Sequence, residues 1–263
     1  MKKEVSNNSL KIFDENRNLA VEIVKDTFNS DIFHLKMGNL HLYDNQIDLF
    51  IVETEAVKNG FDHLSIRVST DDKETLIKLL ESKYLLVDTL VTYKFDCSKT
   101  VLNEMTHKCI IRDYQEKDLS ELISFAQKSF KIDRFHSDPS LDNTYADDYY
   151  AKWIENSCKG YSDRVVVAEL DGEAVGFTTC KLPDAEGNSK LVLSAVSEKS
   201  RGKGVYTSMI HEGLKWLKPN SKVITVGTQI NNYAVQKTWN NLGLYLTESL
   251  YVLHKKIPQN QIL

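Results

Sequence analysis

Residues 194–210 read SAVSEKSRGKGVYTSMI, an apolar strand-like run that enters a basic turn and continues at once as a helix. The first turn of a helix has about four N–H groups without a partner and a partial positive charge, so it suits an anion. Gly202 and Gly204 let the backbone approach a phosphate closely, and Arg201 and Lys203 add positive charge. The turn is therefore a candidate pyrophosphate cradle, with a purely steric glycine turn as the alternative.

The elements around this turn follow a regular order. RVVVAELDGEAVGFTTCKL (164–182) predicts a hairpin that turns at Asp171 and Gly172, and SKLVLSAVS (189–197) predicts the next strand. After the turn we expect a helix from Val205 to Leu217, the strand KVITVGTQ (222–229), the helix NYAVQKTWNNLG (232–243) and the strand LYLTESLYVLHKK (244–256).

This order, and the residues in two of the elements, resemble the GNAT superfamily of coenzyme A-dependent N-acyltransferases. The acyl-CoA motif of that family is Gln or Arg, two residues, Gly, one residue, then Gly or Ala. Arg201 and Gly204 match it, whereas Tyr206 stands where the family usually keeps a residue without a large side chain. A second motif, an asparagine that opens the next helix, an aromatic residue and a glycine, is reproduced by Asn232, Trp239 and Gly243. The resemblance implies an α+β fold with a mixed, mostly antiparallel central sheet flanked by helices.

The resemblance also implies a role for acyl-CoA as co-substrate. In the family the backbone after the first loop residue binds the CoA pyrophosphate, and the splayed strand before the loop pairs with the pantetheine amides. The asparagine adds a side-chain hydrogen bond, and a backbone N–H near Val196 is the family's candidate for the oxyanion. The residues implied to bind the co-substrate are Leu193, Ala195, Val196, Arg201, Gly202, Lys203, Gly204, Val205, Tyr206, Thr207, Asn232 and Trp239.

The N-terminal region narrows the resemblance. HLSIRVSTDDKETLIKLLESKYLLVDTLVTY (63–93) and DTFNSDIFHLKMGNL (26–40) resemble the dTDP-fucosamine acetyltransferase group, whose members acylate the amine of a nucleotide-linked deoxysugar. The polar, unpatterned DCSKTVLNEMTHK (96–108) predicts a boundary near residue 104. We therefore expect a smaller α/β domain at 1–104, with a degenerate GNAT-like domain as an alternative, and a GNAT catalytic domain at 105–263.

Two local expectations concern the N-terminal region. DLFIVET (48–54) has the composition of a strand, and DDKETLIKLLESK (71–83) predicts a helix capped by Asp71 or Asp72. No internal repeat is evident in the sequence.

The insertion KIDRFHSDPSLDNTYADDYYAKWIENS (131–157) lies where a GNAT acceptor pocket is commonly built. Arg134 could pair with an acceptor phosphate, His136 or Asp138 could bond sugar hydroxyls, and an aromatic side chain could stack on thymine. The alternative is that these residues pack a core. The candidate acceptor residues are Arg134, Phe135, His136, Asp138, Tyr149, Tyr150 and Trp153.

N-acylation needs a neutral amine, an aligned thioester and donors for the oxyanion. His136 is the candidate base because imidazole changes charge close to neutral pH, and Asp138 is the competing choice. In the related sugar enzymes a tyrosine in the asparagine helix protonates the departing thiolate, but here that position holds Trp239, whose N–H is no usable acid. Tyr206 could substitute for that acid, or fill space beside the sheet while solvent protonates the thiolate.

Composition sets limits on partners. The chain has 263 residues, 41% hydrophobic and 27% charged, which favours two folded domains. A net charge of -4 gives no basic footprint for nucleic acid, and no apolar run approaches the roughly 20 residues of a membrane span. The start MKKEVSNNSLKIF lacks an apolar signal core, which predicts the cytoplasm. Four separated cysteines and seven scattered histidines give no metal-ligand pattern, so we expect no metal.

These observations predict a cytoplasmic N-acyltransferase that acts as a monomer or homodimer. It moves an acyl group, acetyl or a larger one such as 3-hydroxybutanoyl, from acyl-CoA to the amine of a dTDP-linked amino-deoxysugar. The product would enter a surface polysaccharide such as the lipopolysaccharide O-antigen. Two alternatives remain: a GNAT acetyltransferase acting on an aminoglycoside or peptide amine, and a non-catalytic CoA-binding module.

Overall fold

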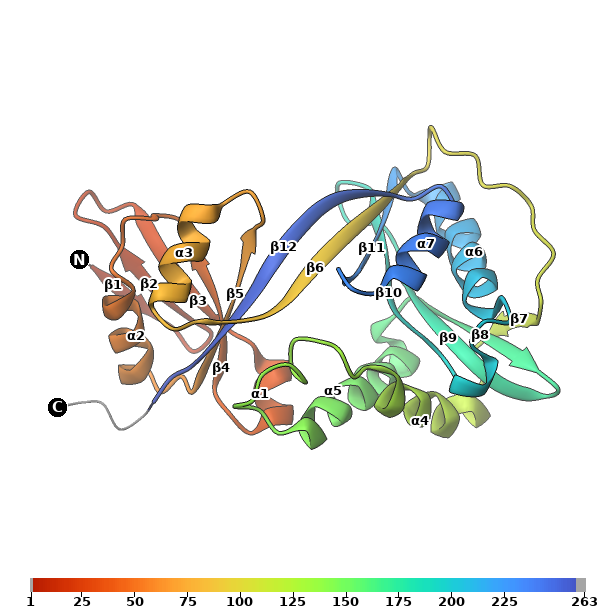
Figure 1. The fold of residues 1–263 in the computed structure, drawn as a ribbon, viewed down its shortest axis with the longest axis horizontal. Coiled ribbons are helices and arrows are strands. Elements are labelled where there is room, and N and C mark those ends of the chain that lie inside the picture. Colours follow the sequence, from red (N-terminus) through yellow and green to blue (C-terminus); the bar gives the residue numbers. More distant parts are fainter. Residues whose placement is uncertain (1, 259–263) are drawn as a thin grey trace. The chain divides into compact units, whose positions relative to one another are not determined.

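The structure, a computed structural model, describes residues 2–258 as two compact units (Figure 1). Among the described residues, unit 1 comprises 2–90, 132–146 and 249–258, and unit 2 comprises 91–131 and 147–248. Neither unit is continuous along the chain, whereas the sequence predicted two consecutive domains. Three elements contribute residues to both units: β6 (Leu85–Asp96), β12 (Tyr245–Lys256) and α5 (Asn143–Asn156).

Unit 1 is built on a sheet with the strand order β1-β2-β3-β4-β5-β12. Paired neighbours are antiparallel except β4 and β5, which run parallel. Its core combines apolar residues from the strands and helices, among them Val52, Leu64, Leu79 and Leu253. The remaining elements are β1 (Lys3–Val5), β2 (Ser9–Phe13), β3 (Leu19–Lys25), α1 (Thr27–Phe33), β4 (Met37–Leu42), α2 (Leu49–Lys58), β5 (His63–Ser69) and α3 (Lys73–Glu81).

Helix α2 corrects one expectation, because residues 48–54 were predicted to form a strand and this is wrong. The Asp48 side chain accepts a hydrogen bond from the Phe50 N–H and so caps the helix. Leu49, Val52 and Ala56 are buried at helical spacing, while Phe50 between them is 74% exposed. A short β-branched run carries no period of its own, so the cap and the next turn decide its structure.

Unit 2 has the strand order β6-β11-β10-β9-β8-β7. Strands β7 to β10 pair antiparallel, and β10 pairs parallel with β11. Its elements are β7 (Ile110–Asp113), α4 (Leu119–Ser129), β8 (Arg164–Leu170), β9 (Glu173–Lys181), β10 (Asn188–Val196), α6 (Val205–Leu217), β11 (Val223–Gln229) and α7 (Tyr233–Asn241). Short 3₁₀ turns lie at Glu116–Asp118, Glu198–Ser200 and Lys218–Asn220, and a π turn lies at Ser157–Tyr161.

Several local predictions in unit 2 are confirmed. The β8–β9 hairpin turns at Asp171 and Gly172, which both have positive φ (53° and 83°), as the favoured two-residue hairpin turn requires. Helix α6 spans the predicted residues 205–217. The mixed, mostly antiparallel sheet with helices confirms the predicted α+β class.

The β–α–β segment formed by β5, α3 and β6 recurs later in the chain. The bounds of β11, α7 and β12 each lie 160 residues after those of β5, α3 and β6. Asp72 and Asn232 occupy the same position before the two helices, and Lys83 (φ 66°) and Gly243 (φ 86°) share a left-handed conformation after them. The expectation of no internal repeat is therefore wrong. The sequence does not reveal the repeat because it is a repeat of backbone geometry, in which most equivalent positions hold different side chains.

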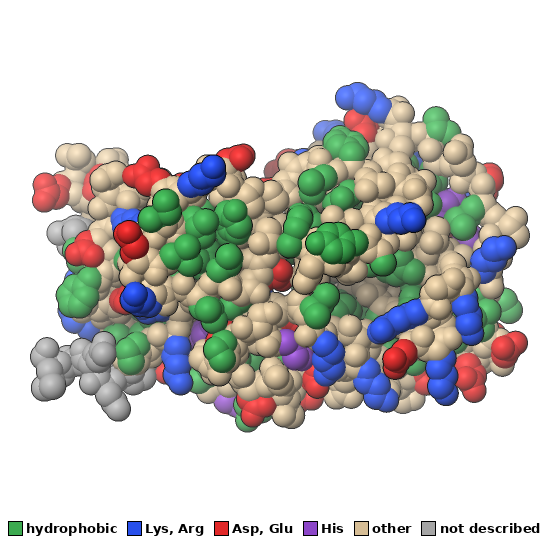
Figure 2. All heavy atoms as spheres, in the orientation of Figure 1, with side chains coloured by type: hydrophobic (Ala, Val, Ile, Leu, Met, Phe, Trp, Pro, Cys, Tyr) green, Lys and Arg blue, Asp and Glu red, His purple; other side chains and the backbone are tan. Residues whose placement is uncertain are grey.

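Apolar side chains gather on the face of unit 1 that carries α3 (Figure 2). In this part of the chain Ile77, Leu80, Leu85 and Leu86 are each more than 40% exposed. Within residues 2–258, no helix has both the length and the apolar character needed to cross a membrane.

Candidate functional site

Strands β10 and β11 of unit 2 separate along their length. They pair only where residues 188–190 face residues 223–225, although β10 continues to Val196. On its other side β10 stays paired with β9, with a bulge between Leu191 and Ser194. A bulge bends a strand locally, which is how the two strands diverge. The side of β10 that faces β11 therefore has no strand partner beyond Lys190, and a peptide-like ligand can pair there.

The glycine loop follows directly at the end of β10. Gly202 (φ 75°) and Gly204 (φ 80°) adopt the left-handed conformation that favours glycine. In residues 2–258, the main-chain N–H groups of 202, 203 and 204 find no acceptor in the protein. Gly204 is the residue before α6, so these groups add to the unpaired donors of the helix N-terminus. The loop has the free donors that an anion requires.

A third basic residue lies beside this loop. A side chain placed on Gly204 would come within 3.1 Å of the Lys108 side chain, and the Lys108 N–H donates to Ser208 Oγ in the first turn of α6. Lys108 is exposed, so its ammonium can follow an anion bound at the loop. The sequence analysis missed Lys108 because it belongs to the polar segment 96–108, which has no pattern that points to a site.

Tyr206 and Trp239, the two departures from the family motifs, contact each other. The Trp239 Nε1–H donates a hydrogen bond of 3.1 Å to the Tyr206 hydroxyl. Trp239 is buried, and its ring packs edge-to-face with the Tyr93 ring, with the two centroids 5.4 Å apart. This packing holds the indole in place. Burial raises the pKa of Tyr206, so the phenol is protonated at neutral pH and is a weaker acid than an exposed tyrosine. The indole orients a phenol that still has a proton to give.

The other predicted CoA residues all lie in unit 2 along the same path. Leu193, Ala195 and Val196 are buried on β10, and the Leu193 N–H donates to Thr179 Oγ1 at 3.0 Å. Asn232 stands before α7 and donates through Nδ2 to Thr228 Oγ1 at 2.9 Å. The structure thus brings β10, the glycine loop, the start of α6 and the start of α7 together in one unit.

The predicted acceptor residues are divided between the units. Arg134, Phe135, His136 and Asp138 belong to unit 1, and Tyr149, Tyr150 and Trp153 belong to unit 2 on α5. The α5 aromatics pack on each other, with centroid distances of 5.0 Å for Tyr149–Tyr150 and 5.4 Å for Tyr149–Trp153. Tyr149 and Tyr150 are buried. Within unit 2, these two rings therefore pack as core residues.

His136 has a carboxylate partner that the sequence analysis missed. Its Nδ1 lies 2.5 Å from Asp133 Oδ2, and Asp133 is buried. The other oxygen of Asp133 accepts from the Phe135 N–H, which fixes the carboxylate. A carboxylate at Nδ1 is the usual means of orienting an imidazole that exchanges protons.

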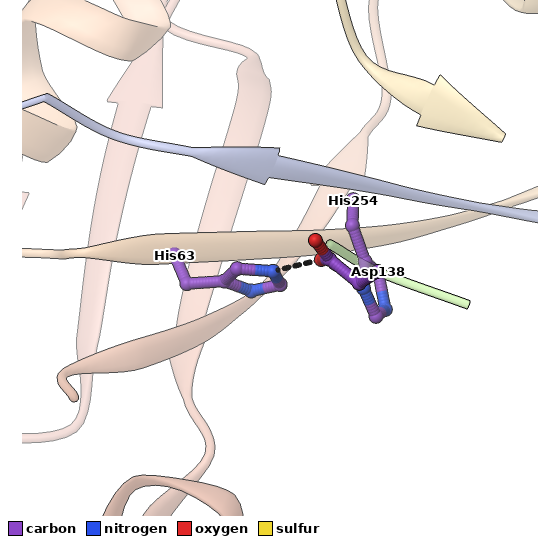
Figure 3. Close-up of side chains that lie close together, drawn as sticks. All are labelled: His63, Asp138 and His254. Atoms are coloured by element: carbon purple, nitrogen blue, oxygen red, sulfur yellow. Dashed lines mark hydrogen bonds and ion pairs between the residues drawn. The ribbon is translucent and has the colours of Figure 1, made fainter. Parts of the chain in front are cut away.

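Asp138 is the centre of a buried polar cluster with His63 and His254 (Figure 3). Its Oδ2 lies 2.9 Å from His63 Nε2 and from His254 Nδ1, and its Oδ1 accepts from the Ser140 N–H and hydroxyl. Burial opposes ionisation of Asp138, but the hydrogen bonds from His254, His63 and Ser140 outweigh it and hold its pKa well below the usual range. Burial lowers the pKa of His254 to about 4. A carboxylate with this many donors is a weak base, so Asp138 is poorly suited to take a proton from a substrate.

The same three residues lie close enough together to be considered as metal ligands. Each offers one atom, and these atoms lie within 4.8 Å of one another. A histidine that binds a metal through one nitrogen needs an acceptor for the N–H on the other. Among residues 2–258, His63 Nδ1 and His254 Nε2 are buried and have no hydrogen-bond partner. Metal binding would turn both into buried N–H donors without acceptors, so the cluster fits neutral histidines on a carboxylate better than a metal ion.

Comparison with known proteins assigns the chain to a family. Residues 121–244 match the model of the Acetyltransferase (GNAT) family. An uncharacterized N-acetyltransferase of Archaeoglobus fulgidus is 31% identical over 109 residues, which cover 38% of this chain and 70% of that protein. The chain belongs to the GNAT family. A crystal structure of a GCN5-related N-acetyltransferase from Sphaerobacter thermophilus has the same fold, with a TM-score of 0.66 and 10% identity over 97% of this chain and 82% of that one.

Two further relatives of this GNAT protein have names that concern sugars. The spore coat polysaccharide biosynthesis protein SpsD of Bacillus subtilis is 25% identical over 138 residues, which are 52% of this chain and 47% of that protein. The dTDP-fucosamine acetyltransferase of Escherichia coli O6:H1 is 26% identical over 144 residues, 54% of this chain and 61% of that protein. The matches thus span less than two thirds of either relative.

Proposed function

We propose that this GNAT protein is an acyl-CoA-dependent N-acyltransferase whose acceptor is the amine of a dTDP-linked amino-deoxysugar. The observation that carries the proposal is the set of unpaired N–H groups at 202–204, which stand at the end of a strand that has separated from its neighbour. Diphosphate and pantetheine are the two parts of CoA that need such donors and such a strand edge. The relatives' names support a sugar-nucleotide acceptor and a polysaccharide product.

The proposed reaction uses these groups in order. The pantetheine arm pairs with β10, and the diphosphate lies on the glycine loop with Arg201 and Lys203 beside it. The neutral amine attacks the thioester carbonyl, a C–N bond forms and the C–S bond breaks. The departing thiolate takes the proton of the Tyr206 hydroxyl, which Trp239 holds in place, and the phenolate then regains a proton from solvent. His136, oriented by Asp133, remains the predicted base for the amine proton, while we assign Asp138 a structural role.

Thiol release from acetyl-CoA with a panel of acceptors tests the proposal. The panel contains dTDP-linked 4-amino and 3-amino deoxysugars, an aminoglycoside and a lysine peptide, and mass spectrometry identifies each product. We expect release with a dTDP-amino sugar and a product heavier by one acyl group. Turnover only with the aminoglycoside or the peptide would contradict the sugar-nucleotide acceptor. CoA binding with no release from any acceptor would favour a non-catalytic module.

A further inference from the structure

Unit 1 contains a second wedge between parallel strands. Strand β4 pairs with β5 only where residues 37–40 face residues 63–66, although β4 continues to Leu42 and β5 to Ser69. The strands β5 and β11 occupy equivalent places in the 160-residue repeat, so this wedge corresponds to the one between β10 and β11. In open sheets, ligands bind outside the carboxyl ends of strands where neighbouring strands diverge.

A cavity of about 450 Å³ occupies this wedge. Both separating strand ends line it, together with Asp72 and Thr75 at the start of α3 and Arg134 from the insertion. Most of its other lining side chains are polar, including Asn39, Ser65 and Arg67. Cavities of several hundred cubic ångströms are the size that proteins use for small-molecule ligands.

Two polar groups in the lining of the cavity have fewer hydrogen-bond or ion-pair partners than such groups usually have in a folded protein. The Thr75 side chain is 4% exposed, and its hydroxyl is buried with no hydrogen-bond partner among residues 2–258. The Arg134 guanidinium donates to Ser65 Oγ at 3.4 Å and lies 4.4 Å from the centre of the Phe135 ring, yet it pairs with no carboxylate in that part of the chain. Buried hydroxyls and half-buried guanidinium groups normally have partners, so a ligand with oxygen acceptors is expected here.

The loop after β4 differs from the glycine loop of unit 2, so we expect a ligand in this wedge to be bound in a different way from CoA. Residues 43–48, YDNQID, contain no glycine. The Lys78 ammonium donates to the carbonyls of Asn45 and Ile47, and Asp48 caps α2 with its own carboxylate. The start of the helix that follows β4 is therefore already capped here, and Arg134 adds a cation to the lining of the cavity.

We propose that the β4–β5 wedge of unit 1 binds the diphosphate of a nucleotide, and that this is how the protein recognises its nucleotide-linked acceptor. The inference rests on the proposed function for the identity of that acceptor. Arg134 binds the phosphate oxygens through its guanidinium fork, and the Thr75 hydroxyl donates to an oxygen of the same ligand. The shared chemistry is a diphosphate ester, which both a sugar nucleotide and CoA carry, and the loop at 43–48 selects the nucleotide.

Calorimetry with thymidine 5′-diphosphate and the full chain, without CoA, tests this assignment. We expect binding that weakens about 10- to 100-fold in Arg134→Gln, since a lost charge-assisted contact is of that order. Arg134→Lys should lose part of the affinity because it keeps the charge without the fork. Thr75→Val keeps the side-chain shape and removes a hydroxyl that has no partner, so it should fold normally and bind several-fold more weakly.

Gly204→Asp is the matched control in the other wedge. It should abolish CoA binding and leave thymidine diphosphate binding unchanged, and CoA should not compete for the wedge of unit 1. Binding that is lost in Gly204→Asp but kept in Arg134→Gln would overturn the assignment, as would no binding by the wild-type protein at millimolar nucleotide.

Turnover separates this inference from the proposed function. If the protein acylates a dTDP-amino sugar and Arg134→Gln leaves its KM unchanged, the inference fails and the proposed function stands. If thymidine diphosphate binds through Arg134 but no dTDP-amino sugar is acylated, the wedge is supported and the proposed reaction fails.

Discussion

Replacing His254 with asparagine should flatten the acid-side loss of stability that the wild-type protein shows. His254 is 1% exposed, and burial lowers its pKa from 6.5 to about 4, although the hydrogen bond to Asp138 opposes that shift. Between those values the unfolded chain binds a proton at this residue and the native protein does not. Stability from the neutral, buried histidine is therefore complete above pH ~6.5 and is lost as the pH falls towards 4.

The size of the effect follows from the depression of the pKa. A difference of about 2.5 pH units at about 1.4 kcal/mol each corresponds to roughly 3 kcal/mol of unfolding free energy between pH 7 and pH 4. Asp138 acts in a lower window. Its pKa is also depressed, so its contribution is present above the unfolded value near ~3.9 and disappears only as the pH falls below that.

Urea denaturation at pH 7, 6, 5 and 4, with the slope and the midpoint fitted together, measures the effect. Asparagine places an amide donor where His254 Nδ1 donates to Asp138, and it cannot titrate. We expect the variant to lose most of the pH dependence that this residue contributes. His41→Asn is the matched control, because His41 is exposed and its replacement should keep the wild-type slope. An unchanged pH slope in His254→Asn would refute the reasoning.

The remaining predictions concern the CoA side. Gly204→Asp should raise the acyl-CoA KM severely or abolish binding, because it sets a carboxylate against the phosphate donors; unchanged CoA affinity in a folded variant would make the loop a structural turn. Lys108→Gln should raise the KM for acyl-CoA a few-fold without making the salt dependence of that KM steeper. An unchanged KM would show that Lys108 is a surface residue with no part in CoA binding. Tyr206→Phe should lower kcat about 10-fold or more with little change in CoA affinity, and should cost about 1–3 kcal/mol of stability because the Trp239 N–H loses its acceptor. A donor larger than acetyl-CoA should show the higher kcat/KM, since each buried methylene is worth about 0.8 kcal/mol; a clear preference for acetyl-CoA over butanoyl- and 3-hydroxybutanoyl-CoA would show that Tyr206 and Trp239 are packing substitutions.

Unit 2 was the more predictable half because its signals are local. The Asp171-Gly172 turn, the glycines at 202 and 204 and the asparagine at 232 each fix a boundary within a few residues of themselves. The strands and helices between these boundaries can then be predicted from the spacing of their apolar residues. The contact between Tyr206 and Trp239 was not predictable, because it joins two helices and no local sequence pattern indicates how those helices pack.

Unit 1 was less predictable for physical reasons. Its α2 segment is a short β-branched run whose helix depends on the cap at Asp48. The buried cluster joins positions 63, 138 and 254, which lie on separate segments, and no spacing in the sequence brings them together. Asp138 was predicted as a base or a sugar ligand from its neighbours in the sequence alone, and those neighbours do not reveal two histidines that arrive from other parts of the chain.

The path of β12 has a consequence for synthesis of the protein. Residues 250–256 pair with β5, and Leu253 and Ile257 belong to the core of unit 1. A ribosome makes these residues after it has made every residue of unit 2, so the nascent chain must carry β5 with an unpaired edge throughout that time. Unpaired edges attract strands from other chains, which makes this interval the one in which aggregation competes with folding. A stop codon just before residue 249 would therefore damage the half of the protein that was made first.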